Sequence, residues 1–256
     1  DAAAASDAAW QSDADNHYKT CANCTLRVNE AAHTFASGSA VCSVCGYVKI
    51  PAITVAPLGT VAKGTTGLTA TASLASEVEE QYKGLGWTSS VPTVATIDAA
   101  SGAITVVGAG KTTIRATSTY DSTRYGEAEL RVKPDKPVIS VGGDLSTTLQ
   151  QVQKGSTMPT FTVTATSETG TTLSYAWYRN GVLTGGNSAS YTPDESALTA
   201  GLEYSIYCEI KAVTADGVES DITTSKTAKL QIISPLRVQL TRTYGTSTVG
   251  TRASYT

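Results

Sequence analysis

Short runs of β-branched residues, separated by turn residues, fill most of this 256-residue chain and constrain its fold more than any other feature. Within residues 50–132, Thr112, Ile114 and Ala116 fall on one face of such a run, as in a half-buried strand. Gly102 lies in a polar connector between two runs and is placed to close a hairpin. This segment therefore predicts an all-β sandwich.

A second sandwich is predicted between residues 138 and 233. Strict alternation defines its inward-facing sets, which are Phe161, Val163 and Ala165; Leu173, Tyr175 and Trp177; Tyr204, Ile206, Cys208 and Ile210; and Leu230 and Ile232. Asn180-Gly181 is a strong signal for a hairpin turn. Lys133-Pro-Asp-Lys-Pro137 separates the two sandwiches, because its prolines fix φ and discourage either neighbouring strand from running through.

Four of the five cysteines form two Cys-x-x-Cys pairs, Cys21/Cys24 and Cys42/Cys45, with seventeen residues between the pairs. Two thiolates on a tight turn can bind one metal ion, and two such turns complete a tetrahedron. The spacing is within the usual range for structural zinc. We therefore predict one zinc ion bound by Cys21, Cys24, Cys42 and Cys45, which would stabilise a segment too short to bury a large core.

Other interpretations of these residues stay open. Disulfides that join the two pairs, such as Cys21 to Cys42, would suit an oxidising compartment. A redox-active pair is disfavoured because the cysteines lie outside any βαβ context. Both histidines of the chain, His17 and His33, lie in the same segment. Each could replace a cysteine as ligand, orient the site from outside, or pack with Trp10 and Phe35.

Composition limits the partners. Only 16% of residues are charged, the net charge is −3 and the isoelectric point is about 5.4, so we expect no nucleic-acid partner and no attraction to an anionic membrane. No apolar run approaches the roughly 18 residues that span a bilayer, so no membrane insertion is expected of this sequence. Abundant Thr and Ser with low charge is common in extracellular stalk-like bacterial proteins.

The middle segment resembles the bacterial Ig-like domain, group 2. The matching residues are Trp87-Thr-Ser-Ser-Val-Pro-Thr-Val-Ala-Thr-Ile-Asp98, Gly102-Ala-Ile-Thr105, Gly108-Ala-Gly110 and Thr113-Ile-Arg-Ala-Thr117. The resemblance implies that Trp87 packs in the core, that Val94-Ala-Thr-Ile97 is a central strand and that the late glycine permits a turn. These positions define a fold and imply no catalytic role.

The third segment resembles an Ig-like domain more loosely. Ser174-Tyr-Ala-Trp-Tyr-Arg-Asn-Gly181 is similar to strand C with its core tryptophan, and Tyr204-Ser-Ile-Tyr-Cys208 is similar to strand F. Two departures from antibody-type domains stand out. The strand of residues 161–165 has no cysteine, and Ile206 stands where a tyrosine is expected two residues before the cysteine. We therefore expect Cys208 to be a buried free thiol.

The first segment resembles short Cys/His repeats of secreted proteins from Gram-positive gut bacteria. The resemblance rests on Trp10, His17-Tyr-Lys-Thr-Cys-Ala-Asn-Cys24, Ala32-His-Thr-Phe35 and Cys42-Ser-Val-Cys-Gly-Tyr47. A Cys-x-x-Cys-Gly run is typical of a rubredoxin-like half-site, in which Gly46 lets backbone N–H groups approach a thiolate. The first pair departs from it, with Thr25 in place of the glycine. No activity transfers from this resemblance.

The fold class we predict is mainly β, with two Ig-like β-sandwiches in tandem after a small zinc-ribbon-like module. The expected division is a Cys/His module at residues 1–49, a bacterial Ig-like sandwich at 50–133, a second Ig-like sandwich at 138–233, and the start of a further domain or a tail at 234–256. After Ser234-Pro235, Leu236-Arg-Val-Gln-Leu240 has the pattern of an opening strand, so we expect the chain to be a piece of a longer protein.

The expected function is structural or adhesive. Such an array suits a semi-rigid stalk of a secreted or cell-surface protein, from a Gram-positive bacterium, that presents a binding or catalytic region. Two alternatives stay open: a direct binding module for a host glycan or surface protein, and accessory domains of an extracellular hydrolase. We do not expect an enzyme, because both histidines lie in the cysteine segment and no Gly-x-Ser-x-Gly motif occurs.

Overall fold

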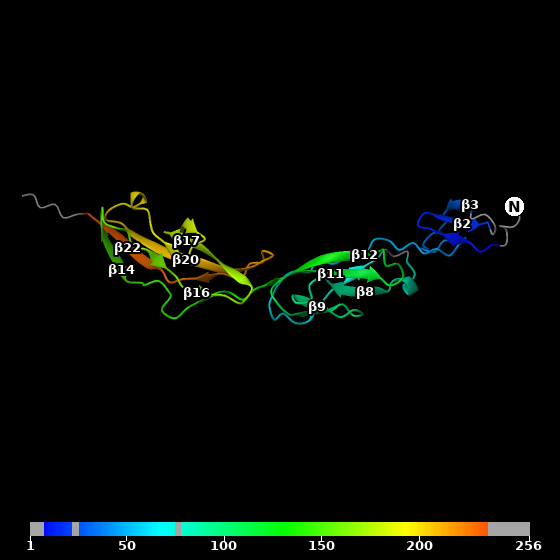
Figure 1. The fold of residues 1–256 in the computed structure, drawn as a ribbon, viewed down its shortest axis with the longest axis horizontal. Helices are drawn as coiled ribbons and strands as arrows, with labels where there is room; N and C mark the ends of the chain where they lie inside the picture. Colours follow the sequence, from blue (N-terminus) through cyan, green and yellow to red (C-terminus); the bar gives the residue numbers. More distant parts are fainter. Residues whose placement is uncertain (1–7, 22–25, 75–77, 235–256) are drawn as a thin grey trace, which may run out of the picture.

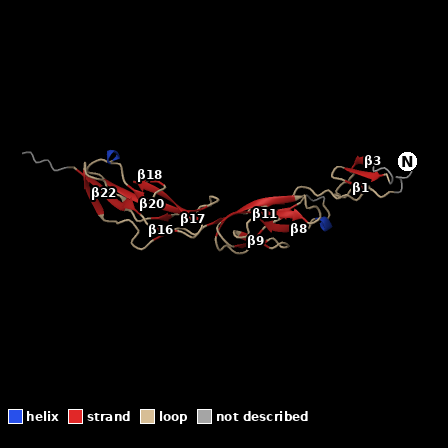
Figure 2. Cartoon of the chain, viewed as in Figure 1, coloured by secondary structure: helices blue, strands red, loops and turns tan. Residues whose placement is uncertain are grey.

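The computed structural model describes residues 8–21, 26–74 and 78–234, which form three successive parts arranged in an elongated line (Figure 1). We call them the N-terminal module (residues 8–49), the first sandwich (53–133) and the second sandwich (138–233). Strands dominate (Figure 2), and helical structure among the described residues is limited to the short 3₁₀ turns η2 (Glu80–Tyr82) and η3 (Glu195–Ala197). The predicted mainly β fold class is confirmed. The predicted strand at 236–240 lies outside the described residues.

The N-terminal module contains one small antiparallel sheet, in the order β1-β2-β3. Its strands are β1 (Gln11–Ser12), β2 (Asn16–Thr20) and β3 (Arg27–Ala32). The chain after β3 is held by two isolated bridges, Phe35 to Cys42 and Val41 to Val48. Few side chains of this module are buried, so little of its stability can come from an aliphatic core.

The first sandwich packs a four-stranded sheet, in the order β5-β12-β11-β8, against a three-stranded sheet, in the order β6-β10-β9, and the pair β4-β7. The strands are β4 (Thr54–Val55), β5 (Gly59–Ala62), β6 (Leu68–Thr69), β7 (Ala72–Ser73), β8 (Leu85–Ser89), β9 (Ala95–Ile97), β10 (Ala103–Val106), β11 (Gly110–Ser118) and β12 (Tyr125–Lys133). Side chains from both sheets form one buried cluster around Trp87, Ile104, Ile114 and Leu130.

The predicted inward face of β11 is confirmed, because Thr112, Ile114 and Ala116 are all buried. The implied central position of Val94–Ile97 is wrong. Among the described strands, the strand there, β9, pairs with β10 alone, and so it lies at the edge of the three-stranded sheet. The strand that follows β10 in sequence, β11, belongs to the other sheet, and this sheet change leaves β9 without a second neighbour.

Gly102 closes the β9–β10 hairpin as predicted, and two constraints require glycine there. Its φ is +72°, which is the left-handed region. A Cβ atom at this position would lie 2.8 Å from the carbonyl oxygen of Ala70 and 3.2 Å from the ring of Trp87. The hairpin turn therefore lies directly against the core tryptophan.

The second sandwich is built on a six-stranded sheet, in the order β14-β22-β20-β17-β18 with β21 beside β20, faced by the pairs β13-β16 and β15-β19. The strands are β13 (Val138–Ile139), β14 (Leu149–Gln153), β15 (Phe161–Thr162), β16 (Ala165–Thr166), β17 (Thr171–Arg179), β18 (Val182–Gly186), β19 (Ser190–Tyr191), β20 (Glu203–Thr214), β21 (Thr223–Thr224) and β22 (Ala228–Ile233). Phe161, Val163, Trp177, Ile206, Cys208 and Leu230 share its core.

The second sandwich also confirms local predictions. Asn180 and Gly181 have φ values of 51° and 77°, as a tight hairpin between β17 and β18 requires. Cys208 is a free thiol with no exposed surface, and burial raises its pKa to about 11. Ile206 stands where antibody-type domains have a tyrosine; two residues earlier, the hydroxyl of Tyr204 accepts a hydrogen bond from the N–H of Thr199 at 2.6 Å.

A small hydrophobic cluster joins the N-terminal module to the first sandwich. It consists of Ala40, Val48, Ile50 and Val78. The hydroxyl of Ser39 also donates to the carboxylate of Glu79 at 2.9 Å. The position that we expected to divide the two parts, between residues 49 and 50, therefore falls inside a shared cluster.

Gly102→Ala should destabilise the first sandwich by about 2–3 kcal/mol, because the new Cβ meets both a carbonyl oxygen and Trp87 in addition to the unfavourable φ. Gly64→Ala is the matched control. Gly64 also has a positive φ, of 82°, but no atom lies within 4 Å of its Cβ position. That control should cost about 1 kcal/mol. Hydrogen-exchange mass spectrometry of peptides from β8 to β11 measures both; equal costs would contradict the steric argument.

Candidate metal centre

Four potential metal ligands come together in the N-terminal module. They are His17, His33, Cys42 and Cys45, and one ligand atom from each lies within 4.8 Å of all the others. His17 and Cys42 are buried, whereas His33 and Cys45 are partly buried. Among the described residues, this is the one group of at least three His, Cys, Asp or Glu side chains with such a spacing.

Strand pairing brings the two histidines together. His17 lies in β2 and faces Ala31 of β3 across the ladder, so His33, two residues beyond Ala31, lies just past the end of the same sheet. The ladder shifts register between His17 and Lys19, which is the irregularity expected of a bulge. The two imidazole rings are 5.8 Å apart, centre to centre. Residues sixteen positions apart in sequence thus become neighbours.

A tight turn brings the two cysteines together. The N–H of Gly46 donates to the carbonyl of Cys42 at 2.9 Å, and the N–H of Cys42 donates to the carbonyl of Tyr47 at 2.7 Å. Gly46 has a φ of +74°, and the N–H of Tyr47 points at the sulfur of Cys45 at 3.5 Å. This agrees with the role predicted for Gly46, since the turn directs backbone N–H groups towards a thiolate.

The donor separations suit a tetrahedral ion. Sγ of Cys42 is 3.9 Å from Nδ1 of His17, and Sγ of Cys45 is 3.4 Å from Nδ1 of His33. Zinc–sulfur bonds of about 2.3 Å and zinc–nitrogen bonds of about 2.0–2.1 Å place the donors of a regular tetrahedron about 3.3–3.8 Å apart. Two thiolates and two imidazoles also form a donor set that suits zinc. The residues present therefore fit such an ion after a small contraction.

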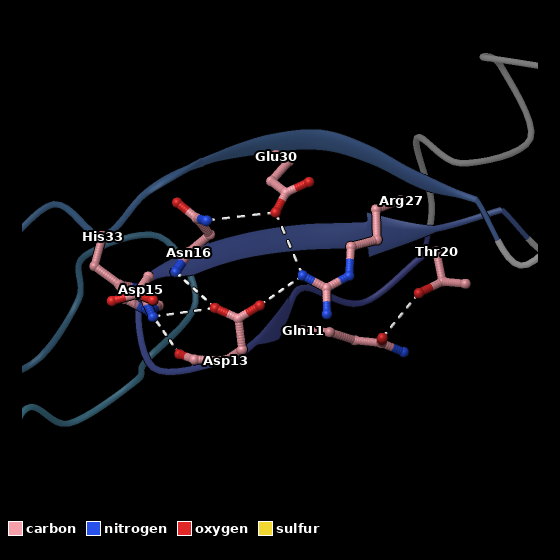
Figure 3. Close-up of polar contacts among 8 residues, drawn as sticks. All are labelled: Gln11, Asp13, Asp15, Asn16, Thr20, Arg27, Glu30 and His33. Atoms are coloured by element: carbon pink, nitrogen blue, oxygen red, sulfur yellow. Dashed lines mark hydrogen bonds and ion pairs between the residues drawn. The ribbon is translucent and has the colours of Figure 1, made fainter.

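A backbone carbonyl orients one of the histidines (Figure 3). Nε2 of His33 lies 3.0 Å from the carbonyl oxygen of Asp13. If that nitrogen carries the proton, Nδ1 is left with a free lone pair, and Nδ1 is the atom that faces Cys45. Burial lowers the pKa of His33, but the hydrogen bond to Asp13 and the neighbouring Cys42 raise it more, so the net shift is upward.

Asp13 is itself held in place by several donors (Figure 3). Its carboxylate accepts hydrogen bonds from the N–H groups of Asp15 and Asn16, and from the guanidinium of Arg27 at 2.5 Å. The hydrogen bond from Asn16, then that from Arg27, lower the pKa of Asp13 to about 2. The β1–β2 turn is thereby fixed, and with it the carbonyl that orients His33.

The two thiols differ in acidity. Burial raises the pKa of Cys42, but the N–H groups of Cys45 and Val44 and the side chain of His33 outweigh burial and lower that pKa to about 5. Burial raises the pKa of Cys45, and the neighbouring Cys42 thiolate adds to that increase. The turn therefore favours the thiolate of Cys42 and disfavours a second thiolate beside it at Cys45.

Aromatic rings enclose the cluster. His33 stacks on Tyr47 with ring centres 4.3 Å apart, and Trp10 meets His17 edge to face at 4.9 Å. Cys45 and Tyr47 also line an open pocket of about 400 Å³ together with Tyr120 and Asp121 of the first sandwich. The cluster is thus the centre of the module, with solvent access on the side of Cys45.

The predicted four-thiolate site meets the structure only in part. Cys42 and Cys45 come together as predicted. Cys21 is disulfide-bonded and is not a member of the cluster, while Cys24 lies outside the described residues. The alternative that was left open, a disulfide between Cys21 and Cys42, is not present, because Cys42 is a free thiol.

The two histidines, which the predicted set does not include, supply the remaining ligand atoms of the cluster. Their spacing matches no ligand motif, since their proximity depends on the β2–β3 ladder. The signal that could have found them is one histidine in the first arm of a hairpin and another just past its second arm, next to a Cys-x-x-Cys turn.

Comparisons with known proteins concern the sandwiches. The family model described as the intimin immunoglobulin-like domain matches residues 83–120, which cover β8 to β11 and the core residue Trp87. The first sandwich is thus similar to an Ig-like domain, in agreement with its facing sheets. Among curated proteins none matches the chain. The finer resemblances, to group 2 and to the Cys/His repeats, stay predictions.

Several solved structures show a distant likeness. Murine CEACAM1b is 15% identical over 72% of this chain and 100% of its own, with a TM-score of 0.35. The fibronectin(III)-like modules of Clostridium thermocellum CbhA are 13% identical over 75% of this chain and 100% of their own, with a TM-score of 0.33. Drosophila N-cadherin EC1-4 is 10% identical over 72% of this chain, with a TM-score of 0.26. This chain covers only 51% of the length of that cadherin structure. At such scores these likenesses carry no argument about function.

Proposed function

We propose that the chain is a structural and adhesive segment of a secreted or cell-surface protein, and that it acts as a semi-rigid stalk. The observation that carries this proposal is the end-to-end arrangement of the three parts, each touching the next only at its end (Figure 1). An array of this shape sets a distance between whatever precedes and follows it.

One further observation supports a role without catalysis. Both histidines of the chain are held beside Cys42 and Cys45, which leaves neither available for a hydrolytic set elsewhere.

The intimin-type match supports an adhesive, extracellular setting. No helix in the described part of the chain is long and apolar enough to cross a membrane. A bacterial Ig-like domain of group 2 and a Gram-positive source belong to the same proposal.

We also propose that the N-terminal module binds one structural zinc ion through His17, His33, Cys42 and Cys45. Most small domains bury aliphatic side chains, whereas this module buries His17 and Cys42 at its centre. A metal ion would satisfy these polar groups and fix the turn and the sheet to one another. The four-thiolate set with Cys21 and Cys24 is the competing assignment. It requires reduction of the disulfide that Cys21 forms in this structure, and matched variants in protein kept under reducing conditions separate the two.

A second candidate function, direct binding of a host glycan or surface protein, is favoured by one feature of the second sandwich. Tyr178 and Tyr207 are cross-strand partners whose rings stack 5.0 Å apart at 8°. They lie on the outer face of the six-stranded sheet, and a pocket of about 310 Å³ beside Tyr178 is lined by Glu209 and Lys211. Rigid aromatic surface beside hydrogen-bonding groups is typical of sugar and protein contacts.

The zinc proposal predicts about one zinc ion per chain in protein purified under reducing conditions, as measured by elemental mass spectrometry. Cys42→Ser with Cys45→Ser should reduce zinc to near zero, because two of four ligands are lost. The matched control, Cys21→Ser with Cys24→Ser, should keep the zinc. Cobalt substitution adds a second measure, since the thiolate-to-cobalt absorbance scales with the number of thiolates. Zinc lost from the control would favour four thiolates, and a metal-free wild type would overturn the proposal.

The stalk proposal predicts an elongated particle in solution. Small-angle X-ray scattering of the whole chain should give a radius of gyration well above the roughly 18 Å of a compact globule of this length. The distance distribution should have a long tail, because the parts are in line. A radius close to the compact value would contradict the stalk.

The binding alternative predicts a ligand on a glycan or host-protein array. Tyr207→Ala should then weaken binding at least tenfold, as for an aromatic residue at the centre of a contact. Tyr125→Ala is the control, because Tyr125 is a half-exposed tyrosine of the first sandwich, far from this face in sequence and fold. Binding that is unaffected by Tyr207→Ala would exclude this face as the site.

A further inference from the structure

Three strands of the first sandwich reach the second sandwich through polar contacts on either side of the linker. Lys63 follows β5, Lys133 ends β12 and Lys111 lies near the start of β11. These three strands are neighbours in one sheet, in the order β5-β12-β11. The contacts are therefore spread across the end of the sheet and do not converge on one point.

The first contact involves Lys63, whose ammonium group bridges two carboxylates. It lies 2.8 Å from the carboxylate of Asp135 in the linker, and it donates to Glu168 in the turn before β17. Glu168 also accepts from the N–H of Asp135 at 3.2 Å. The hydrogen bond to Asp135, then that to Glu168, raise the pKa of Lys63 above its ordinary value.

The second contact is made to backbone. Asp216, in the turn after β20, accepts a hydrogen bond from the N–H of Lys111 at 2.5 Å. The hydroxyl of Thr214 donates to the other carboxylate oxygen of Asp216. Gly110 lies directly beneath: its φ is +133°, and a Cβ there would be 3.1 Å from Asp216 and 3.0 Å from Val94. Because Gly110 has no side chain, the carboxylate of Asp216 can lie this close to the backbone of β11.

The third contact pairs Lys133 with Asp221 at 2.6 Å. The linker between these contacts is itself packed. Pro134 and Pro137 are buried, and the carbonyl of Pro137 accepts from the hydroxyl of Thr223 at 2.5 Å. A pocket of about 530 Å³ lies beside the contacts, lined by residues of both sandwiches.

Exposed ion pairs contribute little one by one. Three attachments on adjacent strands, together with a proline linker, nevertheless restrict bending and twisting at the same time, which a single flexible linker would not. Of the three, the contact of Asp216 with Gly110 and Lys111 is the least tolerant of displacement, because it is directed at backbone and sterically close.

We infer that the two sandwiches form one rigid body, and that Asp216, lying against Gly110 and bonded to the Lys111 N–H, fixes their relative orientation. This inference rests on the proposed stalk role for its purpose only. A rigid joint would exist in a chain of any function, and an elongated chain could have a flexible joint, so the two proposals fail separately.

Residual dipolar couplings of backbone amides in the whole chain test the joint without labels. In the wild type, one alignment tensor should fit residues 53–133 and 138–233 together. Asp216→Ala should separate the tensors and reduce the alignment magnitude of one sandwich relative to the other. Asp216→Asn keeps an acceptor oxygen and should retain the single tensor.

Glu203→Ala is the matched control, because it breaks the Glu203–Lys229 pair, which lies entirely within the second sandwich. It should leave the single tensor unchanged. Chemical shifts within each sandwich report whether any variant unfolds it, and Gly110→Ala provides a second route to the same displacement. Two tensors in the wild type would overturn the rigid joint. A single tensor in both Asp216→Ala and Gly110→Ala would overturn the role of Asp216.

Discussion

Each part of this chain has to bury its own centre, because the parts meet only at their ends. Both sandwiches do so with facing sheets, whose alternate residues close around Trp87 in one and Trp177 in the other. The N-terminal module is too short for two facing sheets. Its centre is instead the group of His17, His33, Cys42 and Cys45, with aromatic rings around it. This difference in what is buried is the reason why a bound ion is proposed for the N-terminal module and for neither sandwich.

Strand faces could be predicted from the sequence because side chains alternate with a period of two wherever one face of a sheet is buried. Tyr204, Ile206, Cys208 and Ile210 are all buried, as their alternation indicated. The same periodicity does not say which strands are neighbours. The central position of β9 is implied only by the family resemblance, and among the described strands β9 has a single partner, β10. Tyr204 makes the same point, since its hydrogen bond to Thr199 depends on a turn outside the strand pattern.

The candidate metal centre also contains one part that the sequence predicts, the cysteine turn, and one part that depends on strand pairing, the histidines. The Cys42–Cys45 turn is local: four residues and a glycine determine it, so the sequence was sufficient. The histidines are not local. His17 reaches the cluster from β2, and His33 reaches it only because β3 returns beside β2. Ligand spacing in sequence is informative for turns and uninformative across a sheet ladder, which is why the second half of the set was expected from Cys21 and Cys24.

The two joints of the array depend on different physics. The joint between the sandwiches is polar and directed, through Lys63, Lys133 and Asp216, and every group in it belongs to a part with a complete core. The joint at the N-terminal module is mainly apolar, through Val48, Ile50 and Val78, with the Ser39–Glu79 hydrogen bond beside them. Val48 lies three residues from Cys45, so its position follows from the fold of the Cys42–Cys45 turn. If that turn depends on an ion, losing the ion would release the module from the first sandwich and leave the joint between the sandwiches intact.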